Sequence, residues 1–199
     1  MEQNGSQQSR DEGWIVVTGG PGSGKTTLVE ALGKRGYATV PEAALQVIEE
    51  LNAALGVEGQ KAWRTTRREE FQVRIAQRQV ALEEAALEGS SGVVFLDRGL
   101  LDGIAFCRHF GSAVPPGLAI AASEAPYDRV LLLDTLENFE DRRATGRTSD
   151  RAASLSLREV LLEVYQEAGF ELLPVPCLPI SERIEFVLKG LALPSQEDF

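Results

Sequence analysis

The sequence predicts an α/β fold, a three-layer sandwich in which helices cover both faces of a five-stranded parallel sheet. Short apolar runs alternate with amphipathic stretches of helical length, a pattern typical of parallel strands joined by crossover helices. The first apolar run leads through a glycine-rich turn into a helical stretch, as expected for a strand–turn–helix unit. Of the 199 residues, 43% are hydrophobic and 25% are charged, which is the composition of a globular chain.

The expected strands are five apolar runs bounded by glycine, proline or charged residues. In chain order they cover residues 14–18, 37–40, 93–96, 130–133 and 170–175. Gly36 separates the first helical stretch from the second apolar run, and Pro41 ends that run. Because each strand is followed by a helical stretch, all five are expected to run parallel.

Helices are expected where apolar residues recur three or four positions apart. They cover residues 25–34, 42–55, 66–88, 101–110, 155–168 and 181–191. Residues 56–61 read as a turn-rich break, and a Pro/Gly segment lies around 115–117. The 66–88 helix is expected to bury an apolar stripe made of Phe71, Ile75, Leu82, Ala85 and Ala86.

Residues 14–191 are expected to form one domain, with two tails. Residues 1–13 are polar and lack the apolar core of a signal peptide, so we expect a disordered leader. Residues 192–199 are expected to form a flexible tail. No apolar run approaches the roughly 20 residues that span a bilayer, so no membrane span and a cytoplasmic location are expected.

The charge balance and the cysteine content exclude several classes of protein. Lysine and arginine total 20 and aspartate and glutamate total 30, a net charge of −10, so a general nucleic-acid binder is not expected. The only cysteines, Cys107 and Cys177, lack the spacing of a zinc site or a disulfide framework. One histidine, His109, argues against a His-dependent triad. We expect Cys107 and His109 to pack or face solvent.

The strongest motif runs from Gly19 to Thr26, with the sequence GGPGSGKT. It matches G-x-x-x-x-G-K-[ST] and lies between a predicted strand and a predicted helix, which is the context of a phosphate-binding P-loop. Backbone N–H groups and the helix N-terminus of such a loop face the phosphates. The lysine reaches the β- and γ-phosphates, and the hydroxyl of Thr26 is a ligand for Mg²⁺. The expected nucleotide-binding residues are Gly20, Pro21, Gly22, Ser23, Gly24, Lys25, Thr26 and Thr27.

Asp97 and Arg98 end the third strand and are candidate catalytic residues. An acid at this position, beside the P-loop strand, is expected to hold Mg²⁺ directly or through water. The alternative is that Asp97 caps the next helix. Arg98 is expected either to contact phosphate or the acceptor hydroxyl, or to pair with Asp102.

Glu42 follows the second strand at the same edge of the sheet. It is placed to accept a proton from an acceptor hydroxyl, or it is a first-turn glutamate stabilised by the helix dipole. Both interpretations remain open at this stage. Arg78 falls on the apolar face of the 66–88 helix, where it must either contact the acceptor or extend to solvent. A solvated face with an aromatic anchor is expected at Trp63, Arg64, Arg67 and Arg68.

An arginine-rich segment follows the fourth strand, at residues 135–151. It contains Arg142, Arg143 and Arg147, and we expect it to be a lid that closes over the triphosphate. Arg147, beside Gly146, is the candidate catalytic arginine, and Arg142 and Arg143 are candidates to cover the base or the phosphates. The alternative is a surface helix neutralised by Glu137, Glu140 and Asp141.

Taken together, the segments TGGPGSGKTTLVEAL, VPEAA, VFLDRGLLDGIAF, GRT, VYQEAGFELLPVP and ERIEFVL resemble the NadR/Ttd14-like AAA domain family, a kinase-like branch of the P-loop proteins. The resemblance covers about residues 14–191 and implies binding of ATP or GTP with Mg²⁺. The layout is also similar to deoxynucleoside and ribosylnicotinamide kinases. In nucleoside kinases a glutamate after the second strand acts as base and an acid–arginine pair ends the third strand, positions that Glu42 and Asp97-Arg98 match.

The resemblance also has departures. Nucleoside kinases usually have serine after the acid–arginine pair, where this chain has Gly99. On the 66–88 helix only Gln72 and Gln77 are candidates to read a base. The function expected is therefore a small-molecule kinase that transfers phosphate from ATP to a hydroxyl or phosphate acceptor. The alternatives are a nucleotide-dependent regulatory protein and a stand-alone hydrolase. No guanine-specific Asn/Thr-Lys-x-Asp signature follows the fourth strand, which favours ATP.

Overall fold

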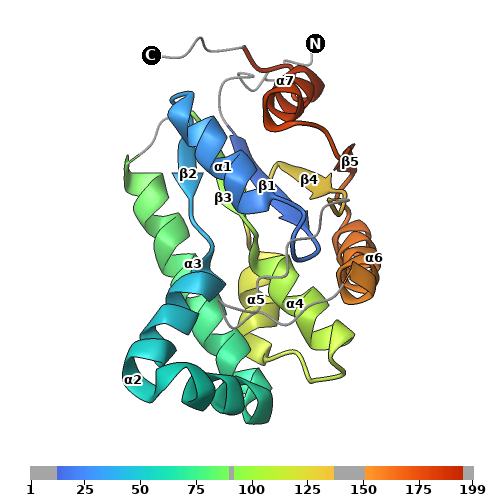
Figure 1. Ribbon diagram of the computed structural model, residues 1–199. Coiled ribbons are helices and arrows are strands. Elements are labelled where there is room, and N and C mark those ends of the chain that lie inside the picture. The colour runs from blue at the N-terminus through green and yellow to red at the C-terminus, as the bar shows by residue number, and fades with distance from the viewer. Residues whose placement is uncertain (1–12, 90–91, 137–150, 195–199) are drawn as a thin grey trace, which may run out of the picture.

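The computed structural model describes residues 13–89, 92–136 and 151–194. Five strands form one parallel sheet in the order β2-β3-β1-β4-β5 (Figure 1). The strands are β1 (Gly13–Gly19), β2 (Ala38–Val40), β3 (Val93–Asp97), β4 (Arg129–Leu133) and β5 (Leu172–Val175). In the central strand, Val17 pairs with Asp97 on one side and with Leu131 on the other. The predicted parallel five-stranded sheet is confirmed.

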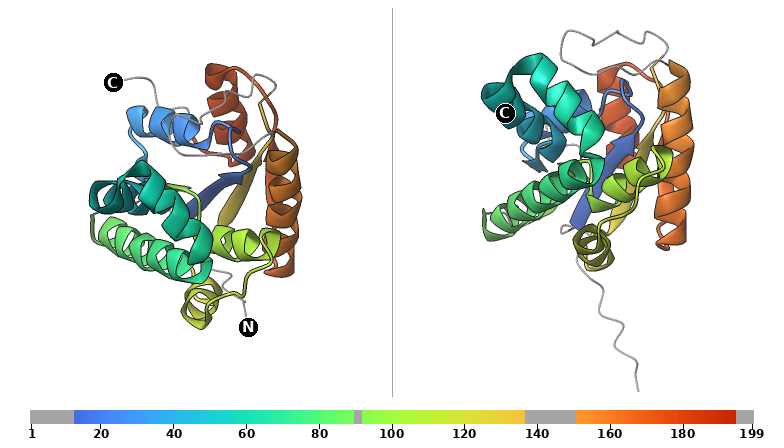
Figure 2. Two further views of the ribbon diagram at one scale, coloured as in Figure 1. Left: turned by 60° about the horizontal axis from the view of Figure 1, so that its bottom comes forward. Right: turned by 90° about the horizontal axis from the view of Figure 1, so that it is seen from below.

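Helices cover both faces of the sheet, which confirms the three-layer arrangement (Figure 2). The helices are α1 (Lys25–Lys34), α2 (Ala43–Thr66), α3 (Arg68–Gly89), α4 (Leu100–His109), α5 (Pro116–Ser123), α6 (Arg151–Glu167) and α7 (Ile180–Gly190). Helices α1 and α7 pack on one face, and α4 and α6 pack on the other. The alternation of side chains along β1 separates the two layers, since Ile15 and Val17 join the core under α1 and α7 while Trp14 and Val16 join the core under α4 and α6.

Three expected boundaries differ from the structure. The expected break is confirmed at Gly56, whose φ of 70° and ψ of 169° are not helical and kink α2, but residues 57–61 are helical where a turn was expected. Helix α5 occupies the segment that the prolines and glycine suggested was irregular, and Pro116 at its start suits the first turn of a helix. Helix α6 begins at Arg151, four residues before the expected start and inside the expected lid.

The expected apolar stripe of the 66–88 helix is confirmed only in part. Leu82 and Ala86 pack against the core, and Phe71 and Ile75 are partly buried. The buried residues of α3 are Gln72, Ala76, Gln79 and Glu83, and Ala85 is exposed. Helix α3 also forms one wall of a pocket and contacts the loop after β3, where the side-chain nitrogen of Gln79 donates to the Arg98 carbonyl at 3.4 Å. Periodicity of apolar residues therefore indicated part of the buried face and missed the polar side chains buried beside it.

Arg78 bridges two helices and does not contact the pocket. It donates a 3.1 Å hydrogen bond to Gln46 and forms an ion pair with Glu50, both on α2. Of the two expected roles of Arg78, these contacts favour the position at a helix edge over contact with an acceptor. Trp63 is an aromatic anchor as expected, with the guanidinium groups of Arg67 and Arg74 over its ring.

The expected leader (residues 1–13) lies outside the described residues except for Gly13, which begins β1. Of the expected tail, residues 195–199 lie outside them as well, while Leu193 packs against the core and the carbonyl of Pro194 accepts a 2.7 Å hydrogen bond from the Tyr37 hydroxyl. Among the described helices, none combines the length and apolar character required to cross a bilayer.

Candidate functional site

The P-loop connects β1 to α1, as the motif predicted. At two positions of the loop, the backbone conformation or the available space favours glycine. Gly24 adopts a φ of 82°, in the left-handed region. A Cβ at Gly20 would lie 2.3 Å from Oγ and 2.4 Å from the carbonyl oxygen of Ser154 on α6, so no larger residue fits there without displacement of the helix.

Lys25 is 5% exposed and folds back over the loop. Its Nζ donates to the carbonyl oxygens of Gly19 at 3.0 Å and Gly20 at 2.9 Å, and to Oγ of Ser23 at 3.3 Å. Burial lowers the pKa of Lys25 to about 7, and the nearby Arg98 guanidinium acts in the same direction against the neighbouring carboxylates. The buried Lys25 amino group is therefore held by neutral acceptors, which phosphate oxygens are suited to replace.

Asp97, the last residue of β3, lies beside the start of α1. Its Oδ2 accepts a 2.6 Å hydrogen bond from the Thr26 hydroxyl, while its buried Oδ1 has no hydrogen-bond partner among the described residues. Burial and the charge of Glu42 raise the pKa of Asp97. The N-cap of α4 is Gly99, so the alternative role of Asp97 as a helix cap is wrong. A hydroxyl and a carboxylate with an unused oxygen are the donor types that Mg²⁺ takes from a protein in phosphoryl-transfer sites, so Thr26 and Asp97 fit that ion.

Arg98 is 7% exposed and forms two buried ion pairs. Its Nε donates to Glu42 at 3.2 Å and its terminal nitrogen donates to Asp102 at 2.8 Å. Its guanidinium lies over the ring of Phe106, 5.3 Å from the centroid. Burial alone would lower the pKa of Arg98, but Glu42, Asp102 and Asp97 outweigh it and raise that pKa. Arg98 thus stays charged and positions Glu42, whose side chain makes no capping hydrogen bond at the start of α2.

Asp102 holds the loop after β3 in place. It accepts hydrogen bonds from the hydroxyls of Thr18 at 2.9 Å and Tyr165 at 2.8 Å, from the Gly99 N–H at 3.2 Å, and from Arg98. Arg98 itself has a φ of 77°, a left-handed conformation that costs a non-glycine residue on the order of 1 kcal/mol or more. The four donors to Asp102 stabilise this strained turn.

A second buried carboxylate, Glu83, lies behind the same loop. It accepts hydrogen bonds from the Tyr127 hydroxyl at 2.7 Å and from Gln79 at 2.8 Å. The Tyr127 oxygen in turn accepts the N–H of Leu100 at 2.9 Å. Burial raises the pKa of Glu83 against the effect of these two hydrogen bonds. Glu83 therefore fixes the start of α4 through Tyr127.

The P-loop is also braced from two other helices. Oγ of Ser154 on α6 donates to the carbonyl of Pro21 at 2.8 Å. Arg183 on α7, 3% exposed, donates to the carbonyl of Ser23 at 2.9 Å, and burial lowers the pKa of Arg183. These two contacts bind carbonyl oxygens of the loop from outside it, and its backbone N–H groups are the donors expected to bind phosphate.

A pocket of about 480 Å³ opens beside the P-loop. Its walls come from α2, α3, α4, α5 and α6, and Pro21 of the P-loop lines one end. Glu42, Arg98 and Asp102 lie in its lining. Much of the remaining wall is apolar, and includes Ile75, Ala76, Phe106, Leu118 and Leu157. A cavity of this size suits a small organic molecule.

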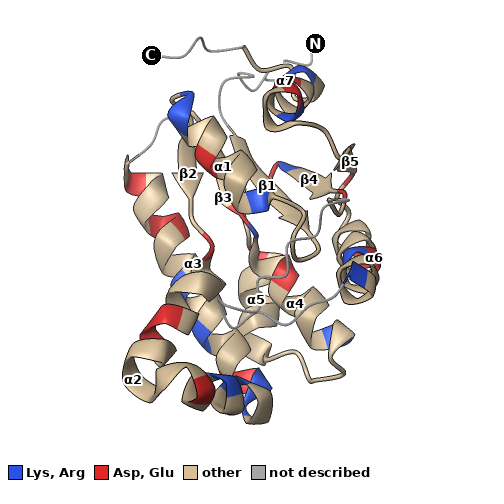
Figure 3. Ribbon diagram, viewed as in Figure 1, with Lys and Arg blue, Asp and Glu red and all other residues tan. Residues whose placement is uncertain are grey.

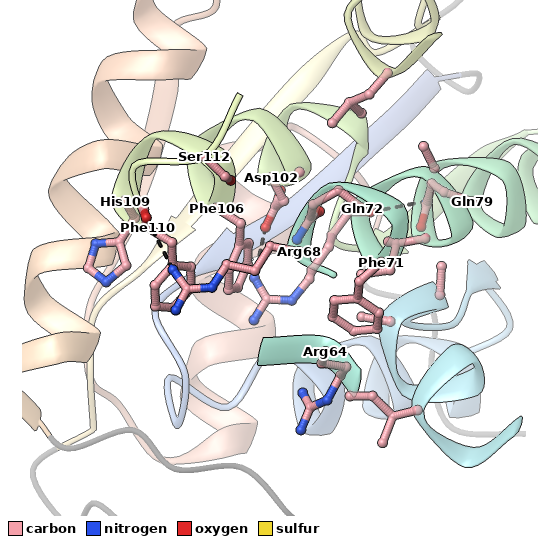
Figure 4. Close-up of a pocket in the computed structure, with 18 of the residues that line it drawn as sticks. Arg64, Arg68, Phe71, Gln72, Gln79, Asp102, Phe106, His109, Phe110 and Ser112 are labelled. Carbon is pink, nitrogen blue, oxygen red and sulfur yellow. Dashed lines mark hydrogen bonds and ion pairs between the residues drawn. The ribbon is translucent and has the colours of Figure 1, made fainter. Parts of the chain in front are cut away.

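Polar side chains of α3 complete the lining. Gln72 and Gln79 both line the pocket (Figure 4), whereas Gln77, the other predicted base-reading candidate, is exposed. Arg64 and Arg68, which read as part of a solvated face, also line it. His109 lies in the lining too, and Cys107 is buried.

The structure thus brings Lys25, Thr26, Glu42, Asp97 and Arg98 together at the carboxyl edge of the sheet. Thr27 is exposed on α1. The predicted lid residues Arg142, Arg143 and Arg147 lie outside the described residues. Sequence reasoning missed several residues that the site depends on, namely Thr18, Glu83, Tyr127, Ser154, Tyr165 and Arg183. No short motif marks them, because each acts on a partner more than 40 positions away.

Comparison with solved structures shows the same fold in nucleoside and nucleotide kinases. A deoxyadenosine kinase from M. mycoides with bound dATP is 16% identical, with a TM-score of 0.63 over 91% of this chain and 100% of that chain. A thymidylate kinase from Candida albicans is 13% identical, with a TM-score of 0.61 over 92% of each chain. NadR protein in complex with NR is 16% identical, with a TM-score of 0.68 over 94% of this chain but only 51% of that one.

Comparison with curated proteins found no match. A family model described as "AAA domain", in contrast, matches residues 14–183, which span the P-loop, the Asp97-Arg98 turn and the start of α7. The match agrees with the sheet order and with the structural neighbours. The chain belongs to the AAA domain family, in a branch with the fold of P-loop kinases.

Proposed function

We propose that this protein is a Mg²⁺-dependent kinase that transfers the γ-phosphate of ATP to a small molecule bound in the pocket beside the P-loop. The observation that carries the proposal is that Glu42 and Arg98 line the pocket, form an ion pair at 3.2 Å, and lie near enough to Lys25 of the P-loop for their charges to act on its pKa. A hydrolase requires only water at that point, whereas this pocket of about 480 Å³ accommodates an organic acceptor. The kinase fold of the structural neighbours supports the same reaction class.

The proposed role of each side chain follows from its position in the site. Lys25 would exchange the carbonyls of Gly19 and Gly20 for phosphate oxygens of the nucleotide. Glu42, held by Arg98, would accept the proton of the acceptor hydroxyl as the hydroxyl oxygen attacks the γ-phosphorus and ADP leaves. Thr26 and Asp97 would hold Mg²⁺, which neutralises charge on the phosphates.

A screen with γ-labelled ATP tests the proposal. The protein is incubated with fractionated metabolite pools, and labelled products other than inorganic phosphate are scored, with Lys25→Ala as the inactive control. We expect a labelled organic product that depends on both the protein and Lys25. Release of inorganic phosphate alone across all pools would favour the hydrolase, and nucleotide binding without turnover would favour the regulatory protein.

A further inference from the structure

The pocket is positively charged in an acidic chain. Four cationic side chains and two carboxylates line it, whereas the whole chain has a net charge of −10. Both carboxylates, Glu42 and Asp102, bind Arg98 at the inner end, so positive charge there is already matched. The other three cations are Lys61 and Arg64, near the end of α2, and Arg68, at the start of α3, where basic residues gather (Figure 3). Lys61 forms an ion pair with Glu58 at 2.9 Å. The positive charge that no described carboxylate pairs with therefore lies at the exposed Arg68.

Arg68 is the clearest member of this group. Its guanidinium lies 5.2 Å from the centroid of the Phe110 ring, and one nitrogen donates to the Phe110 carbonyl at 3.2 Å. Across the described ranges, no carboxylate forms an ion pair with Arg68. A guanidinium carries five N–H donors, so most of those on Arg68 are available to a ligand.

Arg64 lies close to the same space. Its guanidinium is 5.5 Å from the centroid of the Phe71 ring, and Phe71 also lines the pocket. Figure 4 shows Arg64 and Phe71 on one side of the pocket, with Phe106 and Phe110 on the other and Arg68 reaching toward Phe110. Each guanidinium group thus lies against an aromatic ring of the pocket wall.

Two further arginines of the same turn provide a contrast. Arg67 and Arg74 do not line the pocket, and both form ion pairs with Glu70, at 3.4 and 3.0 Å. Both also lie over the ring of Trp63. Arginines on the outer side of the turn therefore have a carboxylate in the fold, whereas Arg68 on the pocket side has none in the described part of the chain.

We propose that the acceptor is an anion. Its body lies against the apolar wall, its hydroxyl lies near Glu42 and Arg98, and a carboxylate or phosphate group at its far end is bound by Arg68 and Arg64, with Lys61 nearby. Guanidinium groups match either anion through paired hydrogen bonds. This inference rests on the proposed kinase function and adds the charge class of the substrate.

The test compares probes that differ only in charge. Para-hydroxymethylbenzoate, para-hydroxymethylphenyl phosphate and the neutral para-hydroxymethylbenzamide are titrated onto the protein saturated with AMP-PNP and Mg²⁺. The variants are Arg68→Met, which keeps an unbranched apolar stem, and Arg74→Met as the matched control. Transfer of labelled phosphate to the same three alcohols is measured in parallel.

We expect at least one anionic probe to bind roughly tenfold or more tightly than the amide, since a hydrogen bond to a charged group contributes on the order of tenfold to a hundredfold in affinity. Arg68→Met should remove that preference without weakening the amide, and Arg74→Met should leave it intact. Equal binding of all three probes, or equal weakening of acid and amide by Arg68→Met, would overturn the inference. Binding preference without any phosphate transfer would instead count against the kinase function alone. The benzoate and phosphate arms identify which anion is preferred.

Discussion

The hydroxyl of Thr26 donates a 2.6 Å hydrogen bond to Oδ2 of Asp97. This contact joins the start of α1 to the end of β3, which lies beside β1 in the sheet. It places the two expected Mg²⁺ ligands in contact, and Oδ1 of Asp97 is buried without a hydrogen-bond partner in the described part of the chain. This is the arrangement on which the proposed Mg²⁺ site rests.

Asp97→Asn should weaken nucleotide binding only when Mg²⁺ is present. Asparagine keeps the size of the side chain and an acceptor for Thr26, but it removes the charge that holds the ion. We expect the gain in ATP affinity on adding Mg²⁺ to fall by about 10- to 100-fold, with little change in EDTA. Fluorescence titration of a labelled ATP analogue measures both. Equal loss with and without Mg²⁺ would assign Asp97 a structural role.

Lys25 should take up a proton when ATP binds at alkaline pH. The pKa of Lys25 in the nucleotide-free protein is about 7, and phosphate charge must raise it on binding. At about pH 8.5 the free lysine is mostly neutral, so uptake of close to one proton is expected; at about pH 6 it is already charged and uptake is close to zero. Calorimetry in two buffers of different ionisation enthalpy counts the protons.

Lys25→Arg provides the control for that measurement. Arginine stays charged at both pH values, so any binding that the variant retains should lack the extra uptake at about pH 8.5. If this variant does not bind, the contrast between the two pH values in the unmodified protein still decides the question. Uptake that is unchanged between those pH values would contradict the lowered pKa.

Glu42→Gln should slow phosphate transfer without loss of ATP affinity. Glutamine still accepts the hydrogen bond from Nε of Arg98, so the turn keeps its geometry, but it accepts no proton from the substrate. General-base catalysis contributes roughly 10²- to 10⁴-fold, and the rate with the acceptor should fall by that amount. Transfer at the unmodified rate would show that Glu42 only positions Arg98.

Tyr127→Phe should destabilise the fold by roughly 1–3 kcal/mol. The change leaves the Leu100 N–H without its acceptor and removes the strongest described donor to Glu83. Denaturant titration measures the loss. Catalytic activity should also fall, because the Tyr127 hydroxyl holds the start of α4 and the turn at Arg98 leads directly into that helix.

Glu83→Gln tests the same network through pH. The folded-state pKa of Glu83 is raised, so the folded protein binds more protons than the unfolded chain between about pH 4.5 and the raised value. Stability attributable to Glu83 is thus fully present at acid pH and is lost as pH rises through that window. The difference in unfolding free energy between the original protein and the variant should therefore decrease as pH rises. A pH-independent difference would contradict the raised pKa.

Gly20→Ala should disrupt the P-loop, because its Cβ would overlap the backbone of Ser154. We expect a lower melting temperature together with weaker ATP binding. Gly117→Ala on α5 is the matched control, since a Cβ there meets nothing within 4 Å; it should be neutral or stabilise by up to about 1 kcal/mol. Two equally mild effects would show that α6 adjusts to the added methyl.

The sequence alone determined the sheet, the position of the P-loop and the placement of Asp97 and Glu42 at strand ends. These features depend on local patterns, such as apolar runs, glycine-rich turns and residue spacing, which act over a few positions. The sequence also predicted the family. It correctly indicated an interruption at Gly56 but failed just after it, where residues 57–61 are helical and continue α2 beyond the kink.

Only the tertiary structure decided which side chains meet. Arg98 binds Glu42, 56 positions away, and Arg183 binds the P-loop from 160 positions away. Arg64 and Arg68 line the pocket, whereas Arg67 and Arg74 form ion pairs with Glu70. The sequence alone does not show which of these four neighbouring arginines line the pocket. The physical reason is that a buried charge is stable only where the fold supplies a partner in three dimensions. The residues next to that charge in the sequence do not identify the partner.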